Sequence, residues 1–153
     1  MTNTTFRLAP WADALYAMDT PWWEKHHAEV NGVGFKGLRV RGTNSAQSKL
    51  ATRANFGSRC LNSGAGALLM AAHYGAELIY MLGYDCGFGA NGERHWHADH
   101  PKGLGNAGSL DKWPRQFADA AKELTHCAVF NASRVTSLTT FPCIELDSII
   151  NYD

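Results

Sequence analysis

LNSGAGALLMAAHYGAELIYMLGYD, residues 61–85, is the stretch that decides the expected fold. The Asn-Ser-Gly turn at 62–64 is typical of a helix start, and the apolar residues after it recur at helical spacing. Residues 78–82 are a short apolar run that predicts a buried strand, and Gly-Tyr-Asp follows at 83–85. Open parallel sheets bind ligands where helix N-termini and the carboxyl ends of strands meet. The segment therefore predicts a small-molecule site.

Strand and helix signals continue to alternate on both sides of this stretch. The expected strands cover residues 12–18, 38–41 and 127–130, and the further helices start near Pro21, near Ser109 or Asp111 and at 145. Strands that alternate with helices predict an α/β fold with a mainly parallel sheet. The segments 43–58 and 83–108 are expected to be long loops, which in compact domains often carry function.

Composition narrows the class of protein. The 153 residues predict a single domain, 1–153, and 14 basic residues balance 14 acidic ones. This balance argues against nucleic acid or a membrane surface as a partner. The four cysteines have no CxxC spacing, which favours reduced thiols, and the polar N-terminus does not resemble a secretory signal. A cytoplasmic location is expected.

A helix start and a strand end supply the first candidate ligand contacts. Asn62, Ser63 and Gly64 combine a capping oxygen with backbone N–H groups that can hold an anion such as a nucleotide phosphate. The alternative is an ordinary helix cap. Tyr84 can contact a phosphate or ribose at the end of the central strand, and Asp85 can orient a hydroxyl group or a metal-bound water there. For this pair the alternative is a simple turn.

Other polar residues are expected near the same sheet edge. Asp19 and Thr20 follow the first strand, and Asn131 and Ser133 follow the last one. The tryptophan pair at 22–23 is expected in the core or at an interface rather than as a stacking platform, because large aromatic side chains usually bury themselves.

HWHADH, residues 95–100, is the densest chemical cluster of the chain. Three imidazoles and one carboxylate can bind a transition metal, and one histidine can instead serve as a general base near neutral pH. An ordinary surface loop is the third interpretation. Because the spacing matches no standard zinc motif, the sequence assigns no metal ligand, although a divalent metal stays compatible with the cluster.

The order of these motifs resembles a known group of Rossmann-like proteins. Segments such as ADALYAxDxxWW, NSGxxAL, GYD, HWHxDHP and VFNASRVTSL are similar to those of tailed-phage and prophage proteins. The group also contains bacterial CMP-sialic-acid-dependent sialyltransferases, motility accessory factor proteins and archaeal 6-hydroxymethylpterin diphosphokinase-type proteins. The resemblance covers roughly residues 3–142 and implies a three-layer Rossmann-like open sheet.

The resemblance also implies roles for individual residues. Asn3, Asp19 and Ser63 match positions that hold the nucleotide in the sialyltransferase branch. Tyr84 matches a tyrosine that lies near the leaving phosphate. The implied donor is a CMP-type nucleotide or nucleotide-sugar.

In that branch a histidine of the following loop serves as the base, which makes His97 and His100 the candidates here. This chain departs from the group before Asn3, where the usual first strand and a GNGPSL-like loop are expected to be missing. Without that strand one sheet edge is expected to be unpaired, which favours self-association into a homo-oligomer.

The main hypothesis is a nucleotide- or nucleotide-sugar-binding, glycosyltransferase-like protein, phage-encoded and located in the host cytoplasm. His97, His100 and Asp85 would act in catalysis, while Ser63 and nearby amides would hold phosphate. The first alternative is a non-catalytic phage accessory protein that binds a small nucleotide or a host protein. The second is a metal-dependent hydrolase that uses the loop at 95–100.

Overall fold

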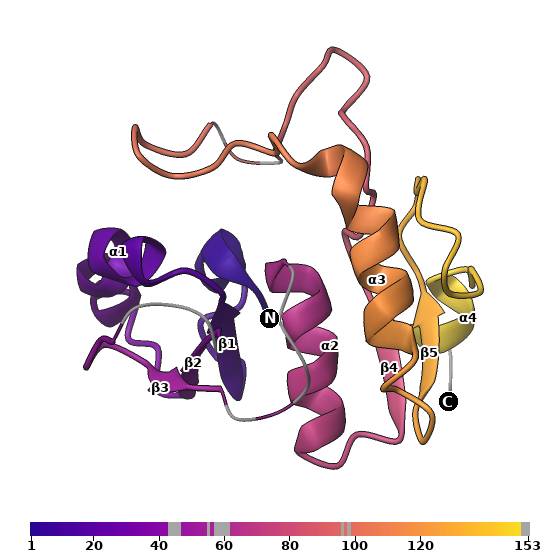
Figure 1. The fold of residues 1–153 in the computed structure, drawn as a ribbon, viewed down its shortest axis with the longest axis horizontal. Coiled ribbons are helices and arrows are strands. Elements are labelled where there is room, and N and C mark those ends of the chain that lie inside the picture. Colours follow the sequence, from indigo (N-terminus) through magenta and orange to yellow (C-terminus); the bar gives the residue numbers. More distant parts are fainter. Residues whose placement is uncertain (43–46, 55, 57–61, 96, 98, 151–153) are drawn as a thin grey trace. The chain divides into compact units, whose positions relative to one another are not determined.

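The chain is a mixture of helices and short parallel strands (Figure 1). The structure, a computed structural model, describes all residues except 43–46, 55, 57–61, 96, 98 and 151–153. Hydrogen bonds group the described strands into a three-stranded and a two-stranded sheet. The chain divides into two compact units, Met1–Tyr74 and Gly75–Asp153, and each is described by itself. The expected single domain stays a prediction.

The first unit contains a parallel sheet with the strand order β1-β2-β3. Its strands are β1 (Ala14–Ala17), β2 (Leu38–Arg41) and β3 (Thr52–Arg53). β1 and β2 were expected from their apolar patterns and are confirmed. β3 lies within the segment 43–58 that was predicted to be a loop, so that prediction was wrong at these two residues. They are extended because they pair with Val40 and Arg41 of β2.

Residues at the N-terminus pair with the other edge of β1. The amino group of Met1 donates to the carbonyl oxygen of Ala14 at 3.0 Å, and the Tyr16 N–H donates to the Met1 carbonyl oxygen at 2.9 Å. Thr2 forms an isolated parallel bridge with Tyr16 before the short 3-10 helix η1 (Asn3–Arg7). This edge of β1 is therefore not unpaired.

Helix α1 (Thr20–Gly32) anchors the first unit through its tryptophans. It begins after Asp19 with Pro21 in its first turn, as expected from the fixed φ angle of proline. Trp22 and Trp23 are both buried, and the indole N–H of Trp23 donates to the carbonyl oxygen of Ala17 at 3.1 Å. The prediction that this pair belongs to the core is confirmed.

Helix α2 (Ser63–His73) packs closely against β1. A Cβ atom placed on Gly66 would lie 2.5 Å from the Cε1, Cζ and hydroxyl oxygen of Tyr16, which is fully buried. Only glycine permits this approach. The helix ends before Gly75, whose φ of 92° requires the left-handed region that glycine tolerates.

Substituting Gly66 with alanine is expected to destabilise the first unit by about 1–3 kcal/mol, because the added methyl group overpacks against Tyr16. Gly32→Ala is the matched control, since nothing lies within 4 Å of the added Cβ atom. This control should be neutral or stabilising by about 0.5–1 kcal/mol. Urea unfolding of both variants measures the difference, and equal stabilities would contradict the close approach.

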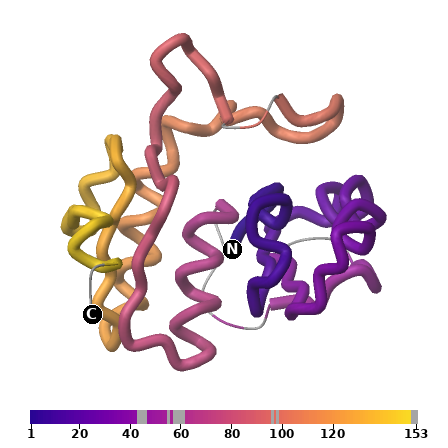
Figure 2. The backbone as a smooth tube through the Cα atoms, turned by 180° about the vertical axis from the view of Figure 1, so that it is seen from behind, coloured from indigo at the N-terminus to yellow at the C-terminus, as the bar shows by residue number. Residues whose placement is uncertain are grey.

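The second unit pairs two parallel strands, β4 (Leu78–Met81) and β5 (Ala128–Asn131). A long excursion leaves β4 and returns through η2 (Leu110–Lys112) to helix α3 (Trp113–Ala121), and Figure 2 traces it in pink and orange. The described part of 83–108 contains no helix or strand, as predicted. After β5 comes the short helix α4 (Asp147–Ile150), the last element among the described residues.

β4 is less buried than its apolar sequence suggests. Met81 is 1% exposed, but Leu78 and Tyr80 on the opposite side of the strand are 50% and 40% exposed. Successive side chains of a strand point to opposite faces of a sheet. The prediction of a buried strand is therefore wrong for one face.

Among the residues that the structure describes, no helix has the length and apolarity that a membrane crossing requires.

Candidate site at the strand ends and in the histidine loop

The start of α2 lies at the carboxyl end of β1, within the first unit. The Met18 N–H donates to the Ser63 hydroxyl oxygen at 3.1 Å, and Asp19 is the next residue in the chain. Burial raises the pKa of the Asp19 carboxyl group, although its side chain stays at the surface. Ser63 and Asp19 thus belong to one region, as the nucleotide hypothesis requires.

Asn62 caps helix α2, which was the alternative to a ligand contact in the sequence analysis. Its side-chain oxygen accepts a hydrogen bond from the Ala65 N–H at 2.8 Å, which is helix capping. Asn3, the third predicted nucleotide contact, lies at the start of η1 with a φ of 46°. Asparagine tolerates this left-handed conformation better than most residues.

Replacing Asn62 with alanine should destabilise the first unit by about 1 kcal/mol, because the Ala65 N–H loses its partner. Asn62→Asp keeps the acceptor oxygen and should retain most of the stability. Thermal unfolding of the two variants beside the original chain makes the comparison. A full loss with aspartate as well would contradict the capping role.

The carboxyl ends of β4 and β5 are joined by side-chain hydrogen bonds to backbone groups. The Tyr84 N–H donates to the Ser133 hydroxyl oxygen at 2.7 Å, and the Thr136 hydroxyl donates to the Tyr84 carbonyl oxygen at 2.7 Å. The Ser137 N–H donates to the Asp85 carbonyl oxygen at 2.7 Å. The expectation that the end of the last strand lies beside Tyr84 and Asp85 is confirmed.

Asn131 lies at the centre of this network, and its side chain is fully buried. Its amide nitrogen donates to the Thr136 hydroxyl oxygen at 3.0 Å, and its amide oxygen accepts from the Ser133 N–H at 3.1 Å. Sequence reasoning missed Thr136. The polar run after β5 was the available signal, but it does not reveal which hydroxyl group reaches Tyr84.

Loss of the Thr136 hydroxyl is expected to cost about 1–3 kcal/mol, since Thr136→Val leaves partly buried polar groups unpaired. Thr136→Ser keeps the hydroxyl and should recover most of that free energy. Ser148→Ala on α4 removes an exposed hydroxyl and serves as the control. Chemical denaturation that finds all three variants equally stable would argue against the network.

Tyr84 and Asp85 differ in what they present to a ligand. The Tyr84 ring packs edge-to-face on Phe117, with ring centroids 5.7 Å apart. Burial, and secondarily the nearby Cys86, raises the pKa of the Tyr84 phenol to about 12, although the residue as a whole keeps some exposure. Asp85 is exposed, and partial desolvation raises the pKa of its carboxyl group. Asp85 is therefore the more accessible of the two side chains.

Cys86 follows directly in a strained conformation. Its φ of 49° is uncommon for a residue other than glycine. Burial, with a smaller effect of Asp85, raises the pKa of its thiol to about 11. The thiol is consequently protonated at neutral pH and is not an activated nucleophile. Cys86, Cys127 and Cys143 are all free thiols, as predicted, whereas Cys60 lies outside the described residues.

The raised pKa of Tyr84 predicts a loss of stability in alkali. The unfolded chain releases this proton near pH 10 and the folded chain near pH 12, so the contribution is complete below pH 10 and disappears as the pH rises towards 12. After allowance for partial exposure, about 1–2 kcal/mol is expected. Tyr84→Phe should flatten this part of the stability-against-pH curve, and an unchanged curve would contradict the shift.

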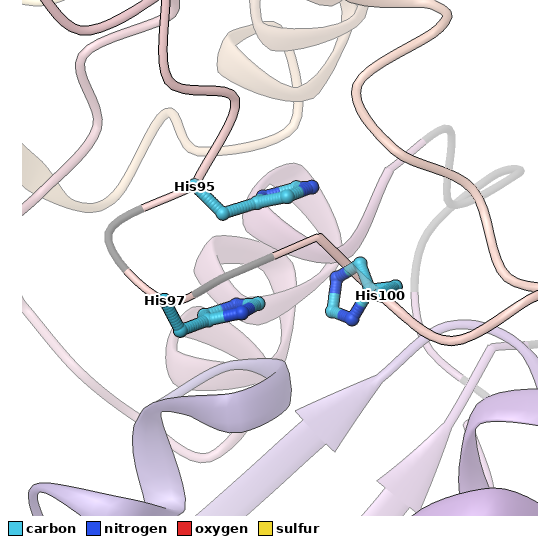
Figure 3. A group of neighbouring side chains, drawn as sticks. All are labelled: His95, His97 and His100. Atoms are coloured by element: carbon cyan, nitrogen blue, oxygen red, sulfur yellow. The ribbon is translucent and has the colours of Figure 1, made fainter.

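The three histidines of the loop at 95–100 come together in the second unit (Figure 3). His95 and His97 stack with nearly parallel rings, 5.1 Å between centroids and 3° between planes. His100 lies beside both rings, with centroids at 4.6 Å from His95 and 4.9 Å from His97. One ring nitrogen from each residue lies within 4.8 Å of the other two.

Two further contacts shape this loop. Asn106 holds the backbone of His100 on both sides: its side-chain oxygen accepts from the His100 N–H at 2.6 Å, and its amide donates to the His100 carbonyl oxygen at 3.3 Å. Arg94 and Asp99 form a loose, exposed ion pair at 3.7 Å. The Nε2 atom of His95 is buried and has no hydrogen-bond partner in the described structure. Desolvation, then the neighbouring His97, lowers the pKa of His95.

An open pocket of about 470 Å³ lies beside the end of β5. Its lining includes Ser133, Arg134 and Thr136 together with residues 143–147. The volume falls in the range of small-molecule pockets. Arg134 was not a sequence candidate, because a single arginine after a strand carries no distinctive signal.

The predicted site residues therefore form local groups in separate units. Asp19, Asn62 and Ser63 belong to Met1–Tyr74, whereas Tyr84, Asp85 and the histidines belong to Gly75–Asp153. Their convergence on one cleft stays a prediction. The chain matches no protein-family model, no curated protein and no solved structure. The resemblance to sialyltransferase-like proteins accordingly stays a prediction too.

Proposed function

We propose that this chain is a glycosyltransferase-like protein that binds a nucleotide or a nucleotide-sugar. In this proposal its parallel strands belong to a three-layer, Rossmann-like open-sheet fold. The observation that carries the proposal is the hydrogen bond from the Met18 N–H to the Ser63 hydroxyl oxygen. It brings a helix N-terminus to the carboxyl end of a parallel strand, which is where open α/β sheets bind phosphate-bearing ligands.

Ser63 retains a hydrogen to donate to a ligand. Its oxygen accepts from Met18, but that bond does not use the hydroxyl hydrogen. The first N–H groups of α2 have no partner within the helix, apart from the one that Asn62 caps. A phosphate oxygen at this position would receive donors from both sources.

The second unit has polar groups of its own that suit a nucleotide-type ligand. Arg134 and the hydroxyl groups of Ser133 and Thr136 line the pocket at the end of β5. A guanidinium group binds phosphate in a bidentate geometry, and the exposed Asp85 can accept a hydrogen bond from a sugar hydroxyl group. The lining also contains the carboxylates of Glu145 and Asp147, so it suits a polar ligand rather than specifically an anionic one.

In the proposed transfer, the bond between the sugar carbon and the phosphate oxygen breaks, and the phosphate keeps the electron pair. The acceptor oxygen forms a bond to the same carbon, and its proton passes to His97 or His100. Donors that stabilise the leaving phosphate, Ser63 among them, would supply much of the rate. Asp85 would orient the donor.

Calorimetric titration of the full chain with CMP and CDP tests the binding step. We expect saturable binding that Ser63→Ala weakens about tenfold, the equivalent of about 1.4 kcal/mol, and that Ser63→Thr largely restores. Ser148→Ala should leave the affinity unchanged. Absence of binding at millimolar nucleotide by a folded sample would overturn the proposal.

A non-catalytic nucleotide-binding role is the second candidate, because the Ser63 hydroxyl already accepts from the Met18 N–H and the Tyr84 N–H is itself held by the Ser133 hydroxyl. Release of CMP from CMP-sialic acid distinguishes the two functions. Saturable nucleotide binding without release would favour the accessory role, whereas release that depends on His97 or His100 would favour the transferase.

A further inference from the structure

We propose that His95, His97 and His100 form a binding site for one divalent transition-metal ion, with Zn²⁺ as the best match. The site does not rest on the proposed nucleotide function, although it shares His97 and His100 with the proposed transfer step. It is carried by the convergence of three imidazole rings on one short loop.

The distances are close to those of a three-histidine site. The ring nitrogens lie within 4.8 Å of one another, whereas nitrogens bound to one tetrahedral zinc ion at about 2.0–2.1 Å are about 3.4 Å apart. The nitrogens therefore have to approach one another by at most about 1.4 Å. Rotation of the stacked His95 and His97 rings away from their parallel arrangement would point their nitrogens towards a common centre.

The donor set selects the kind of metal. Neutral imidazoles suit Zn²⁺, Cu²⁺ and Ni²⁺, whereas Mg²⁺ and Ca²⁺ require mostly oxygen ligands. The one carboxylate within the loop, Asp99, is exposed and forms an ion pair with Arg94. Three protein nitrogens leave one position of a tetrahedral ion for a water molecule or another ligand.

The surroundings of the rings favour binding as well. All three histidines are half-buried. A metal ion can therefore reach them from solvent and would still be partly surrounded by protein. The buried Nε2 atom of His95 has no hydrogen-bond partner in the described structure, and coordination would satisfy it. Buried polar atoms are rarely left unpaired.

Asn106 acts as a positioning residue for this site. It holds the backbone of His100 through two hydrogen bonds and also forms a hydrogen bond with the His95 side chain. Residues that orient metal ligands typically contribute 10- to 100-fold to metal affinity. Asn106 therefore helps to keep the His100 ring beside the other two rings.

Zinc titration of the full, chelator-treated chain tests the proposal. We expect one equivalent to bind, and His95→Ala, His97→Ala and His100→Ala each to weaken that binding at least about 100-fold. His27→Ala is the matched control, because His27 is also half-buried but lies on α1 in the other unit. Binding of Co²⁺ should give the intense visible absorption of a tetrahedral ion.

Asn106→Ala provides an independent readout, with an expected 10- to 100-fold loss of zinc affinity and the one-equivalent stoichiometry kept. His97→Gln repeats the test with a polar side chain if the alanine variants unfold. A folded chain that binds no zinc, or histidine variants that bind as tightly as the original chain, would overturn the site. An equal loss in His27→Ala would identify adventitious surface binding and would also overturn it.

Discussion

Every parallel strand ends in backbone groups that need hydrogen-bond partners, and this requirement organises both units of the chain. At β1 the Met18 N–H is satisfied by the hydroxyl of Ser63, and at β4 the N–H and carbonyl of Tyr84 are satisfied by Ser133 and Thr136. Unpaired buried backbone groups cost free energy comparable to a lost hydrogen bond. Side chains from distant segments therefore hold the backbone just past the ends of β1 and β4.

The same requirement limits what the candidate ligand contacts can do. A serine that accepts a backbone hydrogen bond keeps one hydrogen to donate, so Ser63 can serve the fold and a phosphate together. Tyr84 is different, because its ring packs on Phe117 and its backbone is held on both sides. The side chain of Asp85, the next residue, is exposed. The tyrosine and the aspartate thus differ in accessibility, although the sequence presents them as one motif.

The sequence predicts the elements whose signals are local. Capping residues, Pro21 and helical spacing locate α1 and α2, since the information lies within one or two turns. β3 was missed because two residues become a strand only through their pairing with β2. The exposure of Leu78 and Tyr80 depends on which face of the sheet is covered. The roles of Thr136 and Asn106 were missed for a related reason, because both depend on contacts that sequence spacing does not specify.

The histidine loop places two proposals in competition for the same atoms. A general base needs an unshared electron pair on a ring nitrogen, and a metal ion bound at that nitrogen occupies it. His97 and His100 belong to the three-ring cluster, so a metal-loaded chain would not have them as bases through those nitrogens. If both proposals hold, zinc bound at these nitrogens should slow sugar transfer and leave the affinity for the nucleotide unchanged.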